Sequence, residues 1–62
     1  MSRFVIQFST DNAAFDNLDD GVVEVLESLA EDVREYGVES FVPNTTVIDR
    51  NGNRIGTAIW EK

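Results

Sequence analysis

Cysteine and histidine are both absent from this sequence of 62 residues. Disulfide bonds and zinc sites built on thiolates or imidazoles are therefore excluded, and so are a catalytic thiol and a histidine base. The lack of cysteine also fits a cytoplasmic protein. No apolar run is long enough for a signal peptide or a membrane-spanning helix, so we expect no association with a membrane.

Basic residues are scarce as well. Five Lys and Arg stand against twelve Asp and Glu, which gives a formal net charge of -7. The excess of acid lies in residues 11–39, which carry ten carboxylates and one arginine, whereas the remainder carries four basic and two acidic residues. This balance argues against direct binding to nucleic-acid phosphates or to anionic lipid.

The length predicts one domain, residues 1–62, near the lower limit for a self-sufficient core. A chain of this size buries only about 60% of the surface that its unfolded form exposes. With disulfides and zinc excluded, the remaining sources of support are close side-chain contacts and self-association, and a homodimer is therefore considered below.

The longest regular pattern is helical and covers residues 20–37. Its apolar positions are spaced by three and four residues, as one face of an α-helix requires. Asp19 or Asp20 is the expected N-cap, and Gly37 is expected to end the helix through a positive φ angle. The predicted apolar stripe consists of Val22, Leu26, Leu29, Val33 and Tyr36, widened by Ala30.

A strand is predicted before this helix. Residues 3–8 alternate, so Phe4, Ile6 and Phe8 should face the helix. The polar stretch at residues 9–20 predicts a connection, with a short helical turn over residues 12–15 capped by Thr10 or Asp11.

After the helix, residues 38–44 predict a connector, because Pro43 cannot donate to a central ladder. Its Phe41 can reach the core. Residues 45–50 and 53–60 then predict a β-hairpin around Asn51-Gly52.

Two registers are open for this hairpin. A type I′ turn at Asn51-Gly52 places Ile48 opposite Ile55 on the core face, whereas a type I turn over residues 49–52 with a glycine bulge places Val47 there. We favour the second, because Asp, Asn and Gly suit their positions in it.

Together these elements predict an α+β fold with β-α-β-β order, in which one helix covers one face of a three-stranded, mainly antiparallel sheet. The first strand can lie beside the third, antiparallel, or beside the second, parallel, and we prefer the former. The other sheet face has no cover within the chain, which makes it a candidate dimer interface. On the favoured register that face carries Val5, Ile48, Ala58 and Trp60.

A second candidate surface is acidic. Helical spacing gathers several carboxylates into one exposed ridge, which has two interpretations. It can be a solvated face that keeps the protein soluble, or a mimic of nucleic-acid phosphates that binds a basic host or phage protein. The residues are Glu24, Glu27, Glu31, Asp32 and Glu35.

No catalytic or cofactor signature is present. Asp49, Asn51 and Asn53 imitate the start of a calcium loop, but Arg54 follows where the pattern needs glycine, and Trp60 stands where it needs glutamate. A turn in which Asp49 binds backbone amides is the preferred interpretation. We expect neither a metal, a cofactor nor an enzymatic activity.

Two motifs carry a resemblance, T-D-N-A-A-F at residues 10–15 and D-x-N-G-N-x-x-G at residues 49–56. Together they resemble a set of very short, uncharacterised proteins of bacteriophages and bacterial genomes. The resemblance implies a compact phage or prophage accessory protein in the cytoplasm of a bacterial host, and it transfers no functional residue. The predicted function is a small acidic interaction module that self-associates through its open sheet face, with nucleic-acid mimicry as the alternative.

Overall fold

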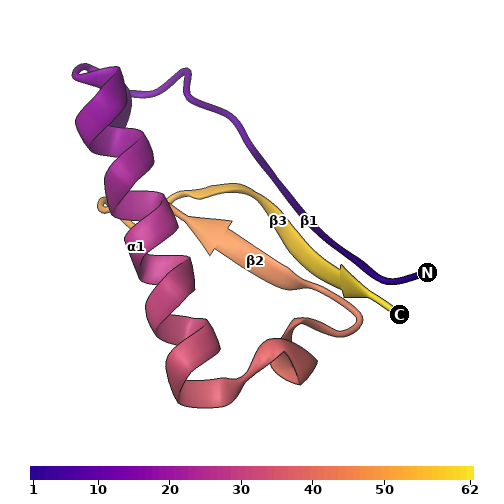
Figure 1. The fold of residues 1–62 in the computed structure, drawn as a ribbon. Helices are drawn as coiled ribbons and strands as arrows, with labels where there is room; N and C mark the ends of the chain where they lie inside the picture. Colours follow the sequence, from indigo (N-terminus) through magenta and orange to yellow (C-terminus); the bar gives the residue numbers. More distant parts are fainter.

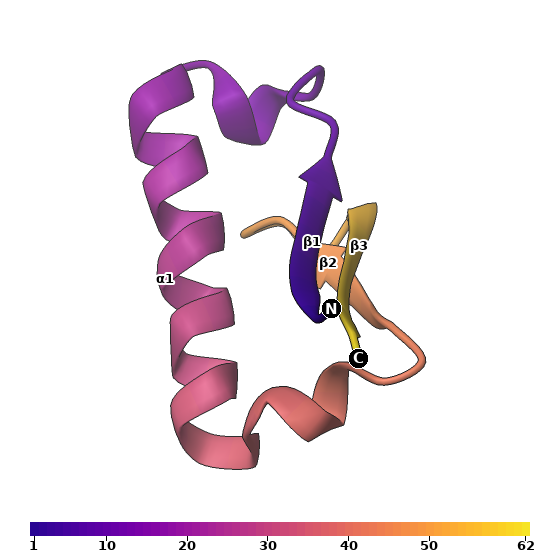
Figure 2. The same ribbon diagram turned by 45° about the vertical axis from the view of Figure 1, so that its right-hand side comes forward.

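The computed structural model describes residues 1–62 as one helix against one face of a three-stranded sheet (Figures 1 and 2). The strands lie in the order β1, β3, β2, and both neighbouring pairs are antiparallel. The predicted α+β class and the preferred strand order are therefore confirmed. The elements are β1 (Arg3–Phe8), η1 (Ala13–Phe15), α1 (Leu18–Tyr36), η2 (Val38–Phe41), β2 (Thr45–Ile48) and β3 (Arg54–Glu61).

The ends of α1 follow local capping chemistry. Asn17 caps the N-terminus, since its side-chain oxygen accepts a hydrogen bond from the Asp20 N–H at 3.2 Å. The prediction of Asp19 or Asp20 as the cap was wrong. Both aspartates lie instead in the first turn, where their negative charge interacts favourably with the positive end of the helix dipole. At the other end Gly37 takes a φ of 81°, and its N–H donates to the Val33 carbonyl oxygen, so the predicted end is confirmed.

The helix is turned about its axis relative to the predicted stripe. Leu26 and Tyr36 were expected in the core but are 46% and 67% exposed. A reason lies at Gly21, where a Cβ atom would come within 2.6 Å of the Phe15 ring. Without that atom η1 packs closely against α1 and draws this side of the helix inward. The buried positions of α1 are Gly21, Val25 and Leu29, with Val22 and Val33 half-buried beside them.

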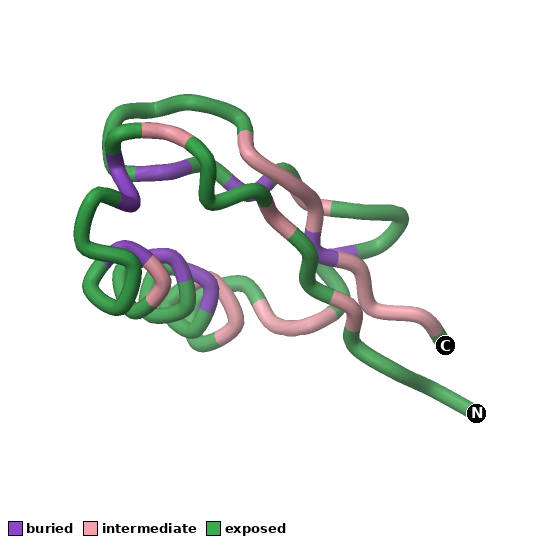
Figure 3. Tube along the Cα trace, turned by 90° about the horizontal axis from the view of Figure 1, so that it is seen from above, coloured by how far each residue is buried: buried purple, intermediate pink, exposed green.

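The core is small and lies between α1, the sheet and the two connecting segments (Figure 3). Phe41 of η2 is fully buried, as expected for that connector, and its ring centroid lies 5.0 Å from that of Phe4. At the opposite end of β1 the rings of Phe8 and Phe15 stack at 6.1 Å. The buried apolar residues are Ala14, Phe15, Val25, Leu29, Phe41, Val47 and Ala58.

The hairpin turn has the favoured type. The Gly52 N–H donates to the Asp49 carbonyl oxygen, the Asp49 N–H donates to the Asn53 carbonyl oxygen, and Gly52 has a φ of 82°. These are the features of a type I turn followed by a glycine bulge. The predicted turn is therefore confirmed, together with a buried Val47 and an exposed Ile48.

The register of the strands beyond the turn differs by one residue from the prediction. Val47 lies opposite Gly56 rather than Ile55, while Ile48 lies opposite Arg54, so Ile55 has no direct partner on β2. An extra residue of this kind reverses the faces of everything that follows it in the strand. The side chains of Ala58 and Trp60 therefore lie on the helix side of the sheet.

Candidate functional site

A groove between β1 and α1 is lined only by apolar residues. It has a volume of about 330 Å³, and β1, α1 and η2 all contribute to it. Phe4, Ile6 and Leu26 are 37%, 39% and 46% exposed, which is high for large apolar side chains that face the second layer of a fold. The lining residues are Phe4, Ile6, Leu26, Leu29, Ala30, Val33 and Val38.

The groove is open because aromatic side chains cover the helix-facing side of β1 only near its two ends. Phe4 contacts Phe41 of η2, and Phe8 contacts Phe15 of η1. Ile6 lies between them and has no such aromatic cover. The turned helix buries Leu29 in the core but presents Leu26 and Ala30 to the groove, where neither is buried. Apolar surface on both walls is therefore left accessible.

The backbone beside the groove is also available for binding. β1 is an edge strand, because its only neighbour in the sheet is β3. The Ser9 N–H donates to the Ile55 carbonyl oxygen at 2.9 Å, just beyond the end of the β1 ladder. Bonded and non-bonded pairs alternate along antiparallel strands, so the backbone groups of Phe8, Ile6 and Phe4 point to the free edge.

The predicted dimer interface is not assembled on one surface. Ala58 is fully buried in the core, and Trp60 is half-buried on the same, helix-facing side of the sheet. Val5 lies on the opposite face, where it pairs with Ile59. Ile48 is 52% exposed near the hairpin turn. The bulge at Ile55 is the physical reason, because it turned Ala58 and Trp60 inward.

The uncovered sheet face is mixed in polarity. The Val5–Ile59 pair lies at its centre, and the neighbouring cross-strand pairs are Gln7 with Thr57 and Arg3 with Glu61. Arg3 and Glu61 also form an ion pair through Arg3 Nε, and this interaction raises the pKa of the guanidinium. The apolar area of this face is thus bordered by polar groups, unlike the groove.

The acidic ridge lies where helical spacing predicts it. Glu27 and Glu35 are exposed and have no basic partner, whereas Glu24 contacts Arg50 at 3.4 Å and Glu31 contacts Arg34 at 3.6 Å. Asp32, the fifth predicted member, is half-buried at the margin of the core-facing side. These contacts are exposed ion pairs, which contribute little to stability.

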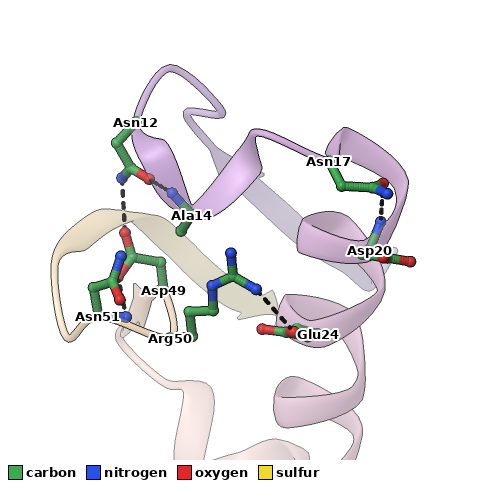
Figure 4. A network of polar contacts seen from close by, with 8 residues as sticks. All are labelled: Asn12, Ala14, Asn17, Asp20, Glu24, Asp49, Arg50 and Asn51. Atoms are coloured by element: carbon green, nitrogen blue, oxygen red, sulfur yellow. Dashed lines mark hydrogen bonds and ion pairs between the residues drawn. The ribbon is translucent and has the colours of Figure 1, made fainter.

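A polar network closes the hairpin end of the molecule (Figure 4). The carboxylate of Asp49 is buried and accepts hydrogen bonds from the backbone N–H groups of Asn51 and Asn53 at 2.8 and 3.0 Å. It also accepts one from the side-chain amide of Asn12 at 2.7 Å. Asn12 in turn caps η1 by accepting from the Ala14 N–H, so the expected turn exists but Thr10 and Asp11 do not cap it.

This network is structural in character. Burial raises the pKa of Asp49, but the hydrogen bonds from Asn53, Asn51 and Asn12 outweigh burial and lower it, so the carboxylate stays ionised. The predicted turn around Asp49 is confirmed. A cavity of about 240 Å³ adjoins it beneath the Arg50–Glu24 pair. No cluster of three or more carboxylates is close enough to hold a metal ion.

None of the helices combines the length and the apolar content that crossing a membrane requires. Comparison of the chain with models of protein families, with curated proteins and with solved structures found no match. The interpretation of the site therefore rests on its own geometry.

Proposed function

We propose that this protein is a non-enzymatic interaction module that binds an extended segment of a protein along β1. The bound segment continues the sheet at the free edge, and its apolar side chains enter the groove between β1 and α1. One observation carries the proposal, namely that a strand edge with free backbone groups borders a groove lined only by apolar residues.

Both halves of this surface match a known way of binding extended segments. Main-chain hydrogen bonds along an edge strand supply affinity, and pockets for alternate side chains supply selectivity. Ile6 and Leu26 are each roughly 40–50% exposed. Covering such a side chain contributes about 1 kcal/mol, because about half of its apolar area leaves water. The chemistry of the partner follows, since the segment must be extended and must alternate apolar and polar residues.

The phage or prophage accessory role that the resemblance implies is part of the same proposal, as is a location in the bacterial cytoplasm. The groove offers a surface at which another protein can bind, which favours an interaction role over an enzymatic one.

A synthetic peptide tests the proposal with a defined probe. A six-residue peptide of alternating valine and lysine is titrated into isotopically labelled protein, and backbone amide shifts are followed by NMR. We expect the largest shifts at Phe4, Ile6 and Phe8 and along the groove wall of α1. A peptide of the same composition, with its valines and lysines in two separate blocks, serves as the control.

The result is decisive in either direction. Equal shifts from both peptides, confined to the glutamates of α1, would mean that charge alone drives binding and would contradict the proposal. Loss of the specific shifts in the Ile6→Lys protein would support it, because that lysine fills the groove without altering the acidic ridge.

A second candidate, nucleic-acid mimicry by the acidic ridge, is favoured by the exposure of Glu27 and Glu35 and their lack of basic partners. It predicts capture of basic, nucleic-acid-binding proteins from a host lysate at low salt, release at high salt, and competition by duplex DNA. Capture that duplex DNA does not reverse would count against mimicry.

A further inference from the structure

We infer that the extended segment bound in the groove is β1 of a second copy of this chain. Two copies pair β1 with β1 in antiparallel orientation about a two-fold axis, which gives one continuous six-stranded sheet with both α1 helices on the same face. This inference rests on the proposed function and names its partner.

β1 has the chemistry that the groove requires. Its apolar residues Phe4, Ile6 and Phe8 alternate with Arg3, Val5 and Gln7, and the first three face the helix layer. The same three residues carry the free backbone groups deduced above. One strand thus offers the hydrogen-bonding edge and the apolar side chains together.

The pairing is self-complementary. With Ile6 opposite its own copy, Phe4 of one chain lies opposite Phe8 of the other, and all of these side chains remain on the helix side of the joined sheet. A two-fold axis requires that one patch serve as both donor and acceptor surface, and an antiparallel edge strand meets that requirement. The two grooves then merge into a shared apolar layer.

Few like charges meet at the contact in this arrangement. The chain carries a formal charge of -7, but β1 contains no carboxylate and has Arg3 as its charged residue. On α1 the groove wall consists of the apolar residues Leu26, Leu29, Ala30 and Val33. Glu24, Glu31 and Glu35 lie roughly 140–180° around the helix from Leu26, and Glu27 lies about 100° from it, because each residue advances about 100°. Most of the acidic ridge therefore points away from the partner, and Glu27 is its member nearest to the groove.

The molecule is large enough to form a dimer interface, and a second copy would enlarge its small core. The Cα extents are 35 × 19 × 18 Å, so a long side measures roughly 670 Å² between Cα atoms and, with side chains included, is comparable to the roughly 800 Å² per partner that a standard interface buries. The core contains seven apolar residues, of which two are alanines, while nine large apolar residues are exposed. Covering Phe4, Ile6 and Leu26 with a second copy adds to a core that is small even for this chain length.

Sedimentation equilibrium of three proteins tests the inference. Wild type is compared with Ile6→Lys, which alters the groove, and with Val5→Lys, a matched change on the neighbouring residue that alters the uncovered sheet face instead. Concentrations from about 10 μM to 1 mM cover the range in which weak dimers form. We expect dimeric wild type, a dissociation constant at least roughly 30-fold higher for Ile6→Lys, and a change under about threefold for Val5→Lys.

Circular dichroism melts show that each variant is folded, and Leu26→Lys replaces Ile6→Lys if the latter is not. Hydrogen exchange adds an independent readout, since the amides of Phe4, Ile6 and Phe8 should exchange more slowly as concentration rises.

The failures of the two proposals differ. If the wild type stays monomeric at about 1 mM while its groove binds the valine–lysine peptide, the inference that the partner is a second copy is wrong, and the proposed function as an interaction module still holds. A dimer lost with Val5→Lys but kept with Ile6→Lys overturns the inference in favour of the uncovered sheet face. A monomer that also ignores the peptide overturns both.

Discussion

The contact between β3 and β1 at Gly56 gives the sharpest test of the fold. A Cβ atom on Gly56 would lie 1.9 Å from the Gln7 carbonyl oxygen and 2.5 Å from the Phe8 Cα. Both neighbours belong to the backbone of β1, so no side-chain rotation relieves the overlap. Gly56→Ala must therefore move β1 away from β3 by more than an ångström, and part of the ladder between them is lost.

The cost follows from two contributions. Overpacking of this kind costs about 1–3 kcal/mol, and each backbone hydrogen bond lost adds about 0.5–1.5 kcal/mol. Replacing glycine also reduces the conformational entropy of the unfolded chain, which offsets about 0.4–1 kcal/mol of this loss of stability. We expect a net loss of about 2–4 kcal/mol, a large fraction of the roughly 3–9 kcal/mol typical for a chain of this length.

Urea denaturation measures the loss, with Trp60 fluorescence and far-ultraviolet circular dichroism as separate probes. The control is Thr57→Ala, the next residue in β3, whose side chain lies on the opposite sheet face and whose replacement should cost under about 1 kcal/mol. A Gly56→Ala protein that loses less than about 1 kcal/mol, with an unchanged denaturant slope, would refute the close approach of the two strands.

Three further changes probe other parts of the structure. Acidification below about pH 4 should destabilise the wild type more than the Asp49→Asn protein, because the pKa of Asp49 is lowered from its usual value of 3.8. Burial raises this pKa, but the hydrogen bonds from Asn53 and its neighbours lower it by more. The stabilisation by this carboxylate is present above the pKa of the unfolded chain and is lost as the pH falls through the folded pKa, and parallel melting curves across this range would contradict it. Asn17→Ala should cost about 1 kcal/mol in urea denaturation while Asn17→Asp retains the cap, so equal losses in both would remove the capping role. Tyr36→Ala should cost under about 0.5 kcal/mol because the side chain is 67% exposed, whereas Leu29→Ala should cost about 2–5 kcal/mol. Similar losses for these two would mean that the helix faces the sheet differently.

Local chemistry accounts for the features that could be predicted from the sequence. The hairpin turn follows from Asp49 and Gly52, whose preferences act within four residues. The end of α1 follows from Gly37 in the same way. The N-cap of α1 was harder to predict, because Asn17, Asp19 and Asp20 all suit that position. The choice among them depends on where η1 ends and α1 can begin.

The register and the orientation of the helix could not be predicted, because contacts between distant segments decide them. The bulge at Ile55 reflects how Gly56 fits against β1, some fifty residues earlier in the chain. The orientation of α1 depends on how closely η1 approaches Gly21. Neither contact produces a periodic pattern in the sequence. A shift of one residue in the register was enough to move Ala58 and Trp60 to the other sheet face.

The groove did leave a signal, although it was interpreted as core. Leu26 and Ala30 extend the apolar arc of α1 beyond the line of Val25 and Leu29. A helix that covers a single small sheet needs a narrower arc than this one has. An apolar arc that is wider than the sheet requires is therefore evidence for a second contact surface, provided that the edge of the sheet beside the extra apolar residues is also free.

β3 is the last strand of the chain and the middle one of the sheet, and this has a consequence for biosynthesis. β1 and β2 do not pair with each other, so every ladder waits for the eight residues of β3. A ribosome delivers the amino-terminal segments first, and β1 then has no strand to pair with until β3 has been synthesised. The nascent chain remains open to chaperones and proteases during that interval, and a product that stops before β3 has no sheet to form.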